Sequence, residues 1–221
     1  MRLTLRDEEP PAGPWRIEPL ASLTALLLEP PRTTKARPPI AAVDGRGASG
    51  KTTLAGRIRA ALPGTQVVHT DDIAWEHSRF GWDDLMIAGV LEPLHDGHDV
   101  HYQPPAWAPH GRTGHIDASA RAPLVIVEGV GASRRELSHL IDTAVWVQSD
   151  WPTAERRGLV RDGGDARALE GWRQWEAEEL PFLAADRPWE RASIIVAGTP
   201  QIGHDPEREV VVAPPLSGRS I

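Results

Sequence analysis

The sequence feature that most constrains the fold is the stretch of residues 40–53, which reads IAAVDGRGASGKTT. A short apolar run leads directly into the pattern Gly-x-x-x-x-Gly-Lys-Thr, which spans Gly45 to Thr52. This pattern is typical of a phosphate-binding loop when it follows a strand and precedes a helix, and the surrounding residues predict both. Glycines permit a tight turn whose N–H groups face inward, and the N-terminus of the next helix adds further donors. The residues expected to surround the phosphates of a nucleotide are Gly45, Arg46, Gly47, Ala48, Ser49, Gly50, Lys51, Thr52 and Thr53.

Lysine is rare in this chain, since Lys35 and Lys51 are the only two and arginine is used almost everywhere else. A compact ammonium and a planar guanidinium are not interchangeable beside phosphates, so lysine at this position indicates a specific contact. We expect Lys51 to reach the β- and γ-phosphates of ATP or another nucleoside triphosphate, and the Thr52 hydroxyl to hold Mg²⁺. The alternative is a glycine-rich turn that only opens a helix.

The composition argues against several classes of function. A net charge of -7 at pH 7 does not suit a nucleic-acid binder, which usually carries a basic stripe. Without cysteine the chain has no disulfide, thiolate metal site or catalytic thiol, which fits a cytoplasmic protein. The N-terminal residues lack the apolar core of a secretion signal, and no apolar run is long enough to predict a membrane span. We therefore expect a small-molecule partner, no nucleic acid and no membrane, and we leave a homodimer open.

Short apolar runs alternate with helical segments, the pattern of a parallel sheet covered by helices. The predicted strands are residues 40–43, 66–69, 124–127, 143–147 and 193–197, with residues 209–213 as a further edge strand. The predicted helices are residues 20–28, the segment from the loop to residue 62, and residues 82–94, 134–140, 151–161 and 166–183. Residues 95–122 lack a clear period, and a stretch of that length without regular structure is often functional. The fold class predicted is α/β, in three layers (α/β/α) with a parallel five-stranded sheet and a small helical lid.

The N-terminal part, residues 1–39, is predicted to pack on a main domain of residues 40–221. Residues 1–18 are polar and rich in proline, which indicates an extended arm or a short strand. Pro30 and Pro31 are expected to end the first helix, and the residues after them to form a linker. We keep this part with the main domain because one helix cannot bury its apolar face alone.

Acidic residues follow two of the predicted strands, at the sheet edge where α/β folds place their ligands. Asp71 and Asp72 follow strand 66–69, and Glu128 follows strand 124–127. One carboxylate near the γ-phosphate can accept a proton from an attacking hydroxyl, and another can hold Mg²⁺ or its water. A turn or helix cap is the alternative for the two aspartates. The phosphate-binding pattern upstream favours the catalytic interpretation.

Three stretches resemble the uridine kinase and phosphoribulokinase group of kinases, to which nicotinamide riboside kinases belong. They read VDGRGASGKTTLA, VVHTDD and LVIVEGV, and the resemblance covers about residues 40–198. It implies that Asp71 is the catalytic base for an acceptor hydroxyl, and that Thr52, Asp71 and Glu128 form the metal site.

The resemblance also implies a lid at about residues 156–170. In this group an arginine-rich helix closes over the phosphates, which implies Arg161 as a catalytic residue and Arg157 as a nucleotide contact. A solvated helix face is the alternative for these arginines.

The acceptor side rests on weaker similarities. His110 and Arg112 match a His-x-Arg element of uridine kinases, and Asp83 resembles the aspartate that those enzymes use on ribose hydroxyls. The Tyr-Asp pair that precedes this element in uridine kinases is missing, so we expect a ring-bearing acceptor with neighbouring hydroxyls, and uridine not to be used at high efficiency. Trp75 and Trp107 lie on predicted site loops and are candidates to stack on such a ring. The candidate acceptor contacts are Asp72, Trp75, Asp83, Tyr102, Trp107, His110 and Arg112.

Two further groups of residues favour a structural interpretation. His95, His98 and His101 lack the i, i+4 spacing of a helical zinc pair, so we expect a loop with partly exposed histidines. Trp172 and Trp175 lie three residues apart on a predicted helix, which favours the core over a base-stacking platform.

The function predicted is ATP-dependent phosphoryl transfer to a hydroxyl of a small molecule, with a nucleoside or ribose-like compound as the expected acceptor. Two alternatives stay open. A nucleoside monophosphate kinase would need basic residues for the acceptor phosphate, which Arg79 and Arg112 could supply. A regulatory ATPase or GTPase would use the loop without any small-molecule acceptor.

Overall fold

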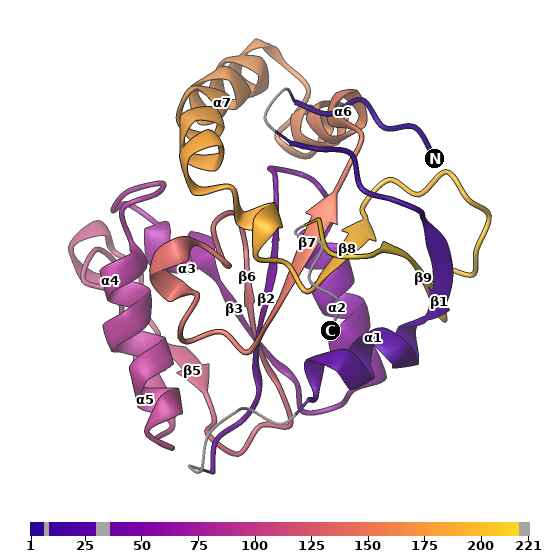
Figure 1. The fold of residues 1–221 in the computed structure, drawn as a ribbon. Coiled ribbons are helices and arrows are strands. Elements are labelled where there is room, and N and C mark those ends of the chain that lie inside the picture. The colour runs from indigo at the N-terminus through magenta and orange to yellow at the C-terminus, as the bar shows by residue number, and fades with distance from the viewer. Residues whose placement is uncertain (7–8, 30–35, 217–221) are drawn as a thin grey trace.

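A seven-stranded sheet in the order β1-β9-β8-β7-β2-β6-β3 forms the centre of the protein (Figure 1). The computed structural model describes residues 1–6, 9–29 and 36–216. The five parallel strands are β2 (Ile40–Gly45), β3 (Gln66–His69), β6 (Val125–Glu128), β7 (Thr143–Gln148) and β8 (Ile194–Ala197). The two antiparallel strands beyond β8 are β9 (Glu209–Ala213) and β1 (Arg16–Pro19). The predicted α/β fold is confirmed. Beyond the five parallel strands expected, the sheet contains β9, which is the predicted edge strand of residues 209–213, and β1, which pairs antiparallel outside it.

Helices cover both faces of this sheet because its central strands are apolar on both sides. Ile40 and Ala42 of β2 pack toward one cluster, whereas Ala41 and Val43 pack toward the other, as the two-residue period of a strand requires. One face is covered by α1 (Leu20–Leu27) and α2 (Lys51–Ala61). The other is covered by α3 (Thr70–Ala74), α4 (Asp83–Met86), the π-helix η1 (Ile87–Leu91) and α5 (Glu92–His95).

A helical hairpin lies beyond the carboxyl ends of the parallel strands, where the lid is predicted (Figure 1). It consists of α6 (Trp151–Arg161) and α7 (Ala166–Asp186). The turn between them contains Gly163 at φ 108° and Gly164 at φ 69°, a conformation that glycine adopts without steric cost. The C-terminal end of α7 and the 3₁₀ turn η4 (Pro188–Glu190) pack against β7 through Leu183, Trp189 and Trp146. The hairpin is therefore anchored to the sheet at one end and stands over the strand ends at the other.

Two segments differ from the structure predicted for them. Residues 95–122 are not without regular structure, because β4 (Val100–Tyr102) and β5 (Ile116–Ala118) form an antiparallel pair, with the 3₁₀ turn η2 (Ala108–His110) between them. Three-residue strands carry too little alternation to be predicted from sequence. The helix expected at residues 134–140 is only the 3₁₀ turn η3 (Arg135–Leu137), and the N–H of Arg135 is bonded to the Asp186 carboxylate at 2.9 Å instead of to a helical carbonyl. Pro30, Pro31 and the first part of the predicted linker lie outside the described residues.

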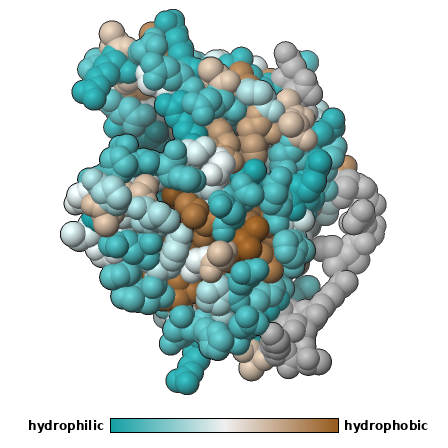
Figure 2. Space-filling view, turned by 90° about the vertical axis from the view of Figure 1, so that its left-hand side faces the viewer, coloured by the Kyte–Doolittle hydropathy of each residue, from teal (hydrophilic) through white to brown (hydrophobic). Residues whose placement is uncertain are grey.

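The side of the protein that carries α4 and α5 is hydrophilic over most of its area, with a band of hydrophobic residues near its centre (Figure 2). Within residues 1–6, 9–29 and 36–216, no helix combines the length and the apolar character that crossing a bilayer would need.

An ion pair holds the N-terminal end of β2. The phosphate-binding pattern follows the opposite, C-terminal end of this strand. Arg37 donates two hydrogen bonds to Asp142, at 2.7 and 2.8 Å, and the Ile40 N–H donates to the same carboxylate at 2.8 Å. Replacement of Asp142 by asparagine is expected to lower the free energy of unfolding by about 1.5–3 kcal/mol, the range for hydrogen bonds to a charged group. Urea denaturation measures this change, and an unchanged midpoint would show that the pair does not contribute to stability.

Candidate functional site

The predicted phosphate-binding loop closes tightly between β2 and α2. Gly50 has φ 102°, which favours glycine. A Cβ on Gly45 would lie 2.7 Å from both the Ser49 hydroxyl and the Val147 carbonyl oxygen. The Ser49 N–H donates to the Arg46 carbonyl at 3.1 Å, which completes the turn. The glycines of the pattern therefore stand where the predicted loop needs them.

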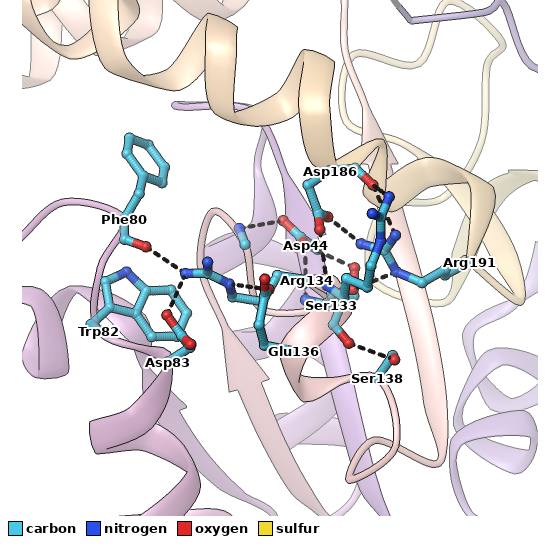
Figure 3. A network of polar contacts seen from close by, with 12 residues as sticks. Asp44, Phe80, Trp82, Asp83, Ser133, Arg134, Glu136, Ser138, Asp186 and Arg191 are labelled. Carbon is cyan, nitrogen blue, oxygen red and sulfur yellow. Dashed lines mark hydrogen bonds and ion pairs between the residues drawn. The ribbon is translucent and has the colours of Figure 1, made fainter.

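Asp44, just before the loop, ties it to the segment that follows β6 (Figure 3). Its fully buried carboxylate accepts hydrogen bonds from the N–H groups of Gly45, Gly131 and Ser133 and from the Ser133 hydroxyl, at 2.7 to 2.9 Å. Burial raises the pKa of Asp44, against the lowering effect of these hydrogen bonds and of the Lys51 charge. Arg191 extends the network by donating to the Ser133 carbonyl at 3.0 Å and to Asp186.

Lys51 begins α2 and is 7% exposed. Its ammonium donates to the Arg46 carbonyl at 2.8 Å, which fixes its direction along the loop. An ammonium has three donors, so two remain for a ligand. This is the arrangement that a contact to phosphate oxygens needs.

Thr52 and Glu128 meet at the ends of neighbouring elements. The Thr52 hydroxyl donates to one oxygen of Glu128 at 3.1 Å, and the Nδ1 atom of His69 lies 2.6 Å from the other. Burial on its own would raise the pKa of Glu128, but the His69 hydrogen bond and the charge of Lys51 outweigh it, so this pKa lies below the ordinary value. The same hydrogen bond raises the pKa of His69. Glu128 is therefore held as an anion beside a hydroxyl.

A cavity of about 910 Å³ opens over these residues. It is lined by the loop from Gly47 to Thr53, by Asp71 and Glu128, and by the α6 residues Arg157 and Arg161. Its size suits a nucleotide-sized ligand, since ligand pockets typically span several hundred Å³. The structure thus brings together all the predicted phosphate, metal and lid residues except Gly45 and Arg46, which lie at the base of the loop.

The two lid arginines have different surroundings. Arg161 forms an ion pair with Asp162 at 2.8 Å, and this hydrogen bond, with a further contribution from the charge of Asp71, raises the pKa of Arg161. Arg157 donates to the Gly198 carbonyl at 3.0 Å, at the carboxyl end of β8. Both arginines line the cavity, Arg161 paired with the neighbouring carboxylate and Arg157 bound to the main chain after β8.

Five of the predicted acceptor residues form one cluster beside Asp71. Arg112 forms an ion pair with Asp72 and stacks on Trp107 with its guanidinium carbon 3.7 Å from the ring centroid. The Trp107 indole donates to the Asp72 carbonyl at 2.9 Å, and Trp75 and His110 meet edge to face at 6.1 Å. Trp107 is 3% exposed, so Arg112 covers the ring face that was a candidate to stack on an acceptor.

The other two predicted acceptor residues lie elsewhere. Asp83 forms an ion pair with Arg134 at 3.2 Å, within the network after β6 (Figure 3). Tyr102 lines a separate pocket of about 330 Å³ against η1, where a Cβ on Gly89 would lie 2.4 Å from its ring. None of the seven predicted acceptor residues lines the main cavity, and these two lie outside the cluster around Asp72 as well.

The two tryptophans of α7 pack against neighbouring segments and also line the cavity. Trp172 is buried against Gly158 of α6, and Trp175 lies over Gly47, with its indole nitrogen 2.9 Å from the position of a Cβ there. The expectation of a core role describes Trp172 well. Trp175 forms the part of the wall that faces the loop.

Three residues at the site were not found from the sequence. For His69 a sequence signal exists, because it is the last residue of β3 and pairs with Glu128, the last residue of β6, in the register of the two strands. Glu179 of α7 accepts a hydrogen bond from the Gly47 N–H at 2.6 Å, and burial raises its pKa. Glu9 binds Arg46 at 2.7 Å. The last two lie far from the loop in sequence, and no local pattern marks them.

The oxygen atoms present fit Mg²⁺ bound together with phosphates. Within the described part of the chain, no group of three or more His, Cys, Asp or Glu side chains is arranged to hold a metal ion. Mg²⁺ in nucleotide sites usually has one or two protein ligands, and phosphates and water complete its shell. The Thr52 hydroxyl and the Glu128 carboxylate supply such hard oxygen donors, and Asp71 lines the same cavity.

No protein-family model matches the sequence, and no curated protein matches it significantly. Among solved structures, a possible uridine kinase from Bacillus stearothermophilus is 20% identical with a TM-score of 0.51, over 80% of this chain and 96% of that one. A putative fructose transport system kinase from Silicibacter sp. TM1040 is 18% identical with a TM-score of 0.51, over 76% of this chain and 91% of that one. The chain shares the fold of these two proteins. At the level of the fold, the predicted relationship to uridine kinase-like proteins with a phosphate-binding loop is thereby supported.

Proposed function

We propose that the protein transfers a phosphoryl group from a nucleoside triphosphate to a hydroxyl of a small molecule. The observation that carries this proposal is that Lys51, the Thr52–Glu128 pair and Asp71 line one cavity at the carboxyl ends of β2, β3 and β6. Phosphoryl transfer needs positive charge beside the phosphates, ligands for a metal ion, and a base that accepts the proton of the attacking hydroxyl. The fold shared with a possible uridine kinase and a putative fructose transport system kinase supports the same reading.

In this proposal each side chain has a defined part. Asp71 accepts the proton of the acceptor hydroxyl as its oxygen attacks the γ-phosphorus and the bond to the β,γ-bridging oxygen breaks. Lys51 and Arg161 stabilise the negative charge on the transferred group. When bound, Mg²⁺ supplies charge neutralisation at the β- and γ-phosphates, and Thr52 and Glu128 would hold it.

The ion pairs on the acceptor side favour an acceptor without a phosphate group. A nucleoside monophosphate kinase would use Arg79 or Arg112 for the acceptor phosphate. Arg112 is paired with Asp72, and Arg79 donates to Glu178 at 2.5 Å. Since each has a carboxylate partner, neither presents an uncompensated charge to an anion. We therefore place a hydroxylated acceptor such as a nucleoside or ribose-like compound ahead of a nucleotide.

Replacement of Glu128 by glutamine is expected to raise the Mg²⁺ concentration for half-maximal turnover about 10- to 100-fold, the usual effect of losing a group that orients a metal site. Glutamine keeps the shape but loses the charge. A titration of ADP release with Mg²⁺ measures the shift. The control is Asp162→Asn, because Asp162 also lines the cavity but its carboxylate is paired with Arg161. An unchanged Mg²⁺ requirement would remove Glu128 from the metal site.

An ADP-release screen tests the proposal as a whole. ATP and Mg²⁺ are combined with nucleosides, nucleoside monophosphates, sugars and vitamins in turn, and ADP is measured. We expect release to depend on a hydroxylated compound other than uridine or cytidine. A nucleoside monophosphate as the best acceptor would favour the nucleotide kinase alternative, and release that no compound stimulates would favour a regulatory ATPase.

A further inference from the structure

The N-terminal segment reaches the phosphate-binding loop through Glu9. Its side chain is 2% exposed and accepts three hydrogen bonds: from Arg46 Nε at 2.7 Å, from Trp146 Nε1 at 2.7 Å and from Gln148 Nε2 at 3.0 Å. Arg46 is the second residue of the loop, and the other two donors lie on β7. Glu9 thus joins the loop to the sheet from outside the motif.

The pairing of Glu9 with Arg46 is buried on both sides, since both residues are less than 10% exposed. A buried ion pair needs good geometry and additional hydrogen bonds, and loss of one partner leaves the other charge uncompensated. The indole and amide donors satisfy the second oxygen of Glu9. Loss of Glu9 would therefore leave the buried Arg46 charge without the carboxylate that pairs with it.

The main chain of Arg46 links the Glu9 contact to Lys51. The Arg46 carbonyl accepts hydrogen bonds from Lys51 Nζ at 2.8 Å and from the Ser49 N–H at 3.1 Å. A shift of Arg46 would therefore move both the ammonium and the turn that aims the loop N–H groups. Gly47, the next residue, is held by Glu179.

Contacts on both sides of Glu9 fix the segment itself, whose first residues run near α6 (Figure 1). The Ala12 N–H donates to Gln148 at 2.9 Å, and Thr4 exchanges hydrogen bonds with Asp150 and the Trp151 N–H at the start of α6. Arg6 stacks on Trp151 at 3.6 Å and forms an ion pair with Glu176 of α7 at 2.5 Å. The segment thus contacts α6, α7, β7 and the loop together.

We infer that Glu9 is a positioning residue of the nucleotide site, which fixes Arg46 and through its carbonyl sets the place of Lys51 and of the loop N–H groups. The inference rests on the proposed function, because it assumes that the loop binds phosphates. It gives the N-terminal segment a part in nucleotide binding in addition to its packing.

The test compares Glu9→Gln with Asp142→Asn, which removes the charge of a second Arg–carboxylate pair at the opposite end of β2, where the Asp142 side chain is 16% exposed against 2% for Glu9. Dissociation constants for Mg-ADP and for inorganic tripolyphosphate are measured by calorimetry, and thermal unfolding is followed in parallel. Glu9→Gln is expected to weaken both ligands by the same factor, about tenfold, as the loss of one charge-assisted hydrogen bond typically does. Asp142→Asn is expected to lower the unfolding temperature and leave both affinities unchanged.

A double-mutant cycle with Arg46→Gln separates positioning from general destabilisation. If Glu9 acts through Arg46, Glu9→Gln has no further effect on affinity once Arg46 is replaced. Should Glu9→Gln not fold, Glu9→Asp keeps the charge with a shorter reach, and a smaller loss of both affinities is expected.

Three outcomes would overturn the inference. The first is an unchanged affinity for both ligands in a folded Glu9 variant. The second is a weaker affinity for Mg-ADP with an unchanged affinity for tripolyphosphate, because in this inference the loop contacts only phosphates. A wild-type protein that binds neither ligand would instead overturn the proposed function, and with it this inference.

Discussion

Replacement of Lys51 by alanine is expected to lower acceptor-dependent ADP release about 10²–10³-fold or more, the cost of removing one preorganised charge-stabilising group. Lys51 is directed by the Arg46 carbonyl and has two donors left for phosphate oxygens. Because those donors meet a charge that grows as the phosphoryl group is transferred, the loss should fall on kcat more than on nucleotide affinity.

The control for this change is Lys51→Arg. It keeps the positive charge but replaces a point charge with a planar fork, so an intermediate rate is expected. Both variants should unfold near the wild-type temperature, because the deleted side chain faces the cavity. Near-normal ADP release by folded Lys51→Ala would contradict the assignment of the loop as the phosphate site.

Replacement of Asp71 by asparagine is expected to lower kcat about 10²–10⁴-fold, the usual contribution of a general base. Asparagine is nearly isosteric but cannot take a proton, and Asp71 is solvent-exposed in the first turn of α3. Packing should therefore be unchanged, and the dissociation constant for Mg-ADP should stay within a small factor of the wild-type value. Steady-state kinetics and calorimetry on one preparation measure both quantities.

Asp72→Asn is the matched control because Asp72 is the next residue and is engaged by Arg112. Its loss should raise the KM for the acceptor more than it lowers kcat. If Asp72→Asn were the variant that binds nucleotide without turning over, the two aspartates would have exchanged roles. If both variants kept their rate, the base would lie elsewhere.

The part of the site that could be predicted from the sequence is the part built by local segments. The strand, loop and helix around Gly45 to Thr52 are consecutive, and a short-range pattern therefore specifies both the turn and the direction of its donors. Asp71 follows β3 closely and Glu128 is the last residue of the neighbouring parallel strand β6, so their convergence follows from the parallel pairing of the two strands. The pairing of His69 with Glu128 could have been found by the same argument.

Contacts between distant segments could not be predicted in this way. Glu9 and Glu179 reach the loop from 37 and 132 residues away, and nothing near either residue marks it as a partner. The same holds for β1, whose pairing with β9 joins the two ends of the chain. Asp83 and Trp107 were predicted as acceptor contacts, Asp83 from its resemblance to an aspartate of uridine kinases and Trp107 from its position on a loop. In the structure Arg134 pairs with Asp83, and Arg112 stacks on Trp107.

The fate of the γ-phosphate is the measurement that tests the central claim most directly. ATP labelled in the γ-phosphate is incubated with Mg²⁺, the protein and the best compound from the ADP-release screen, and the products are separated. The account predicts that the label moves to the acceptor as a phosphate ester in step with ADP, and that Asp71→Asn abolishes the transfer. Label recovered only as inorganic phosphate, at a rate that no acceptor changes, would contradict it.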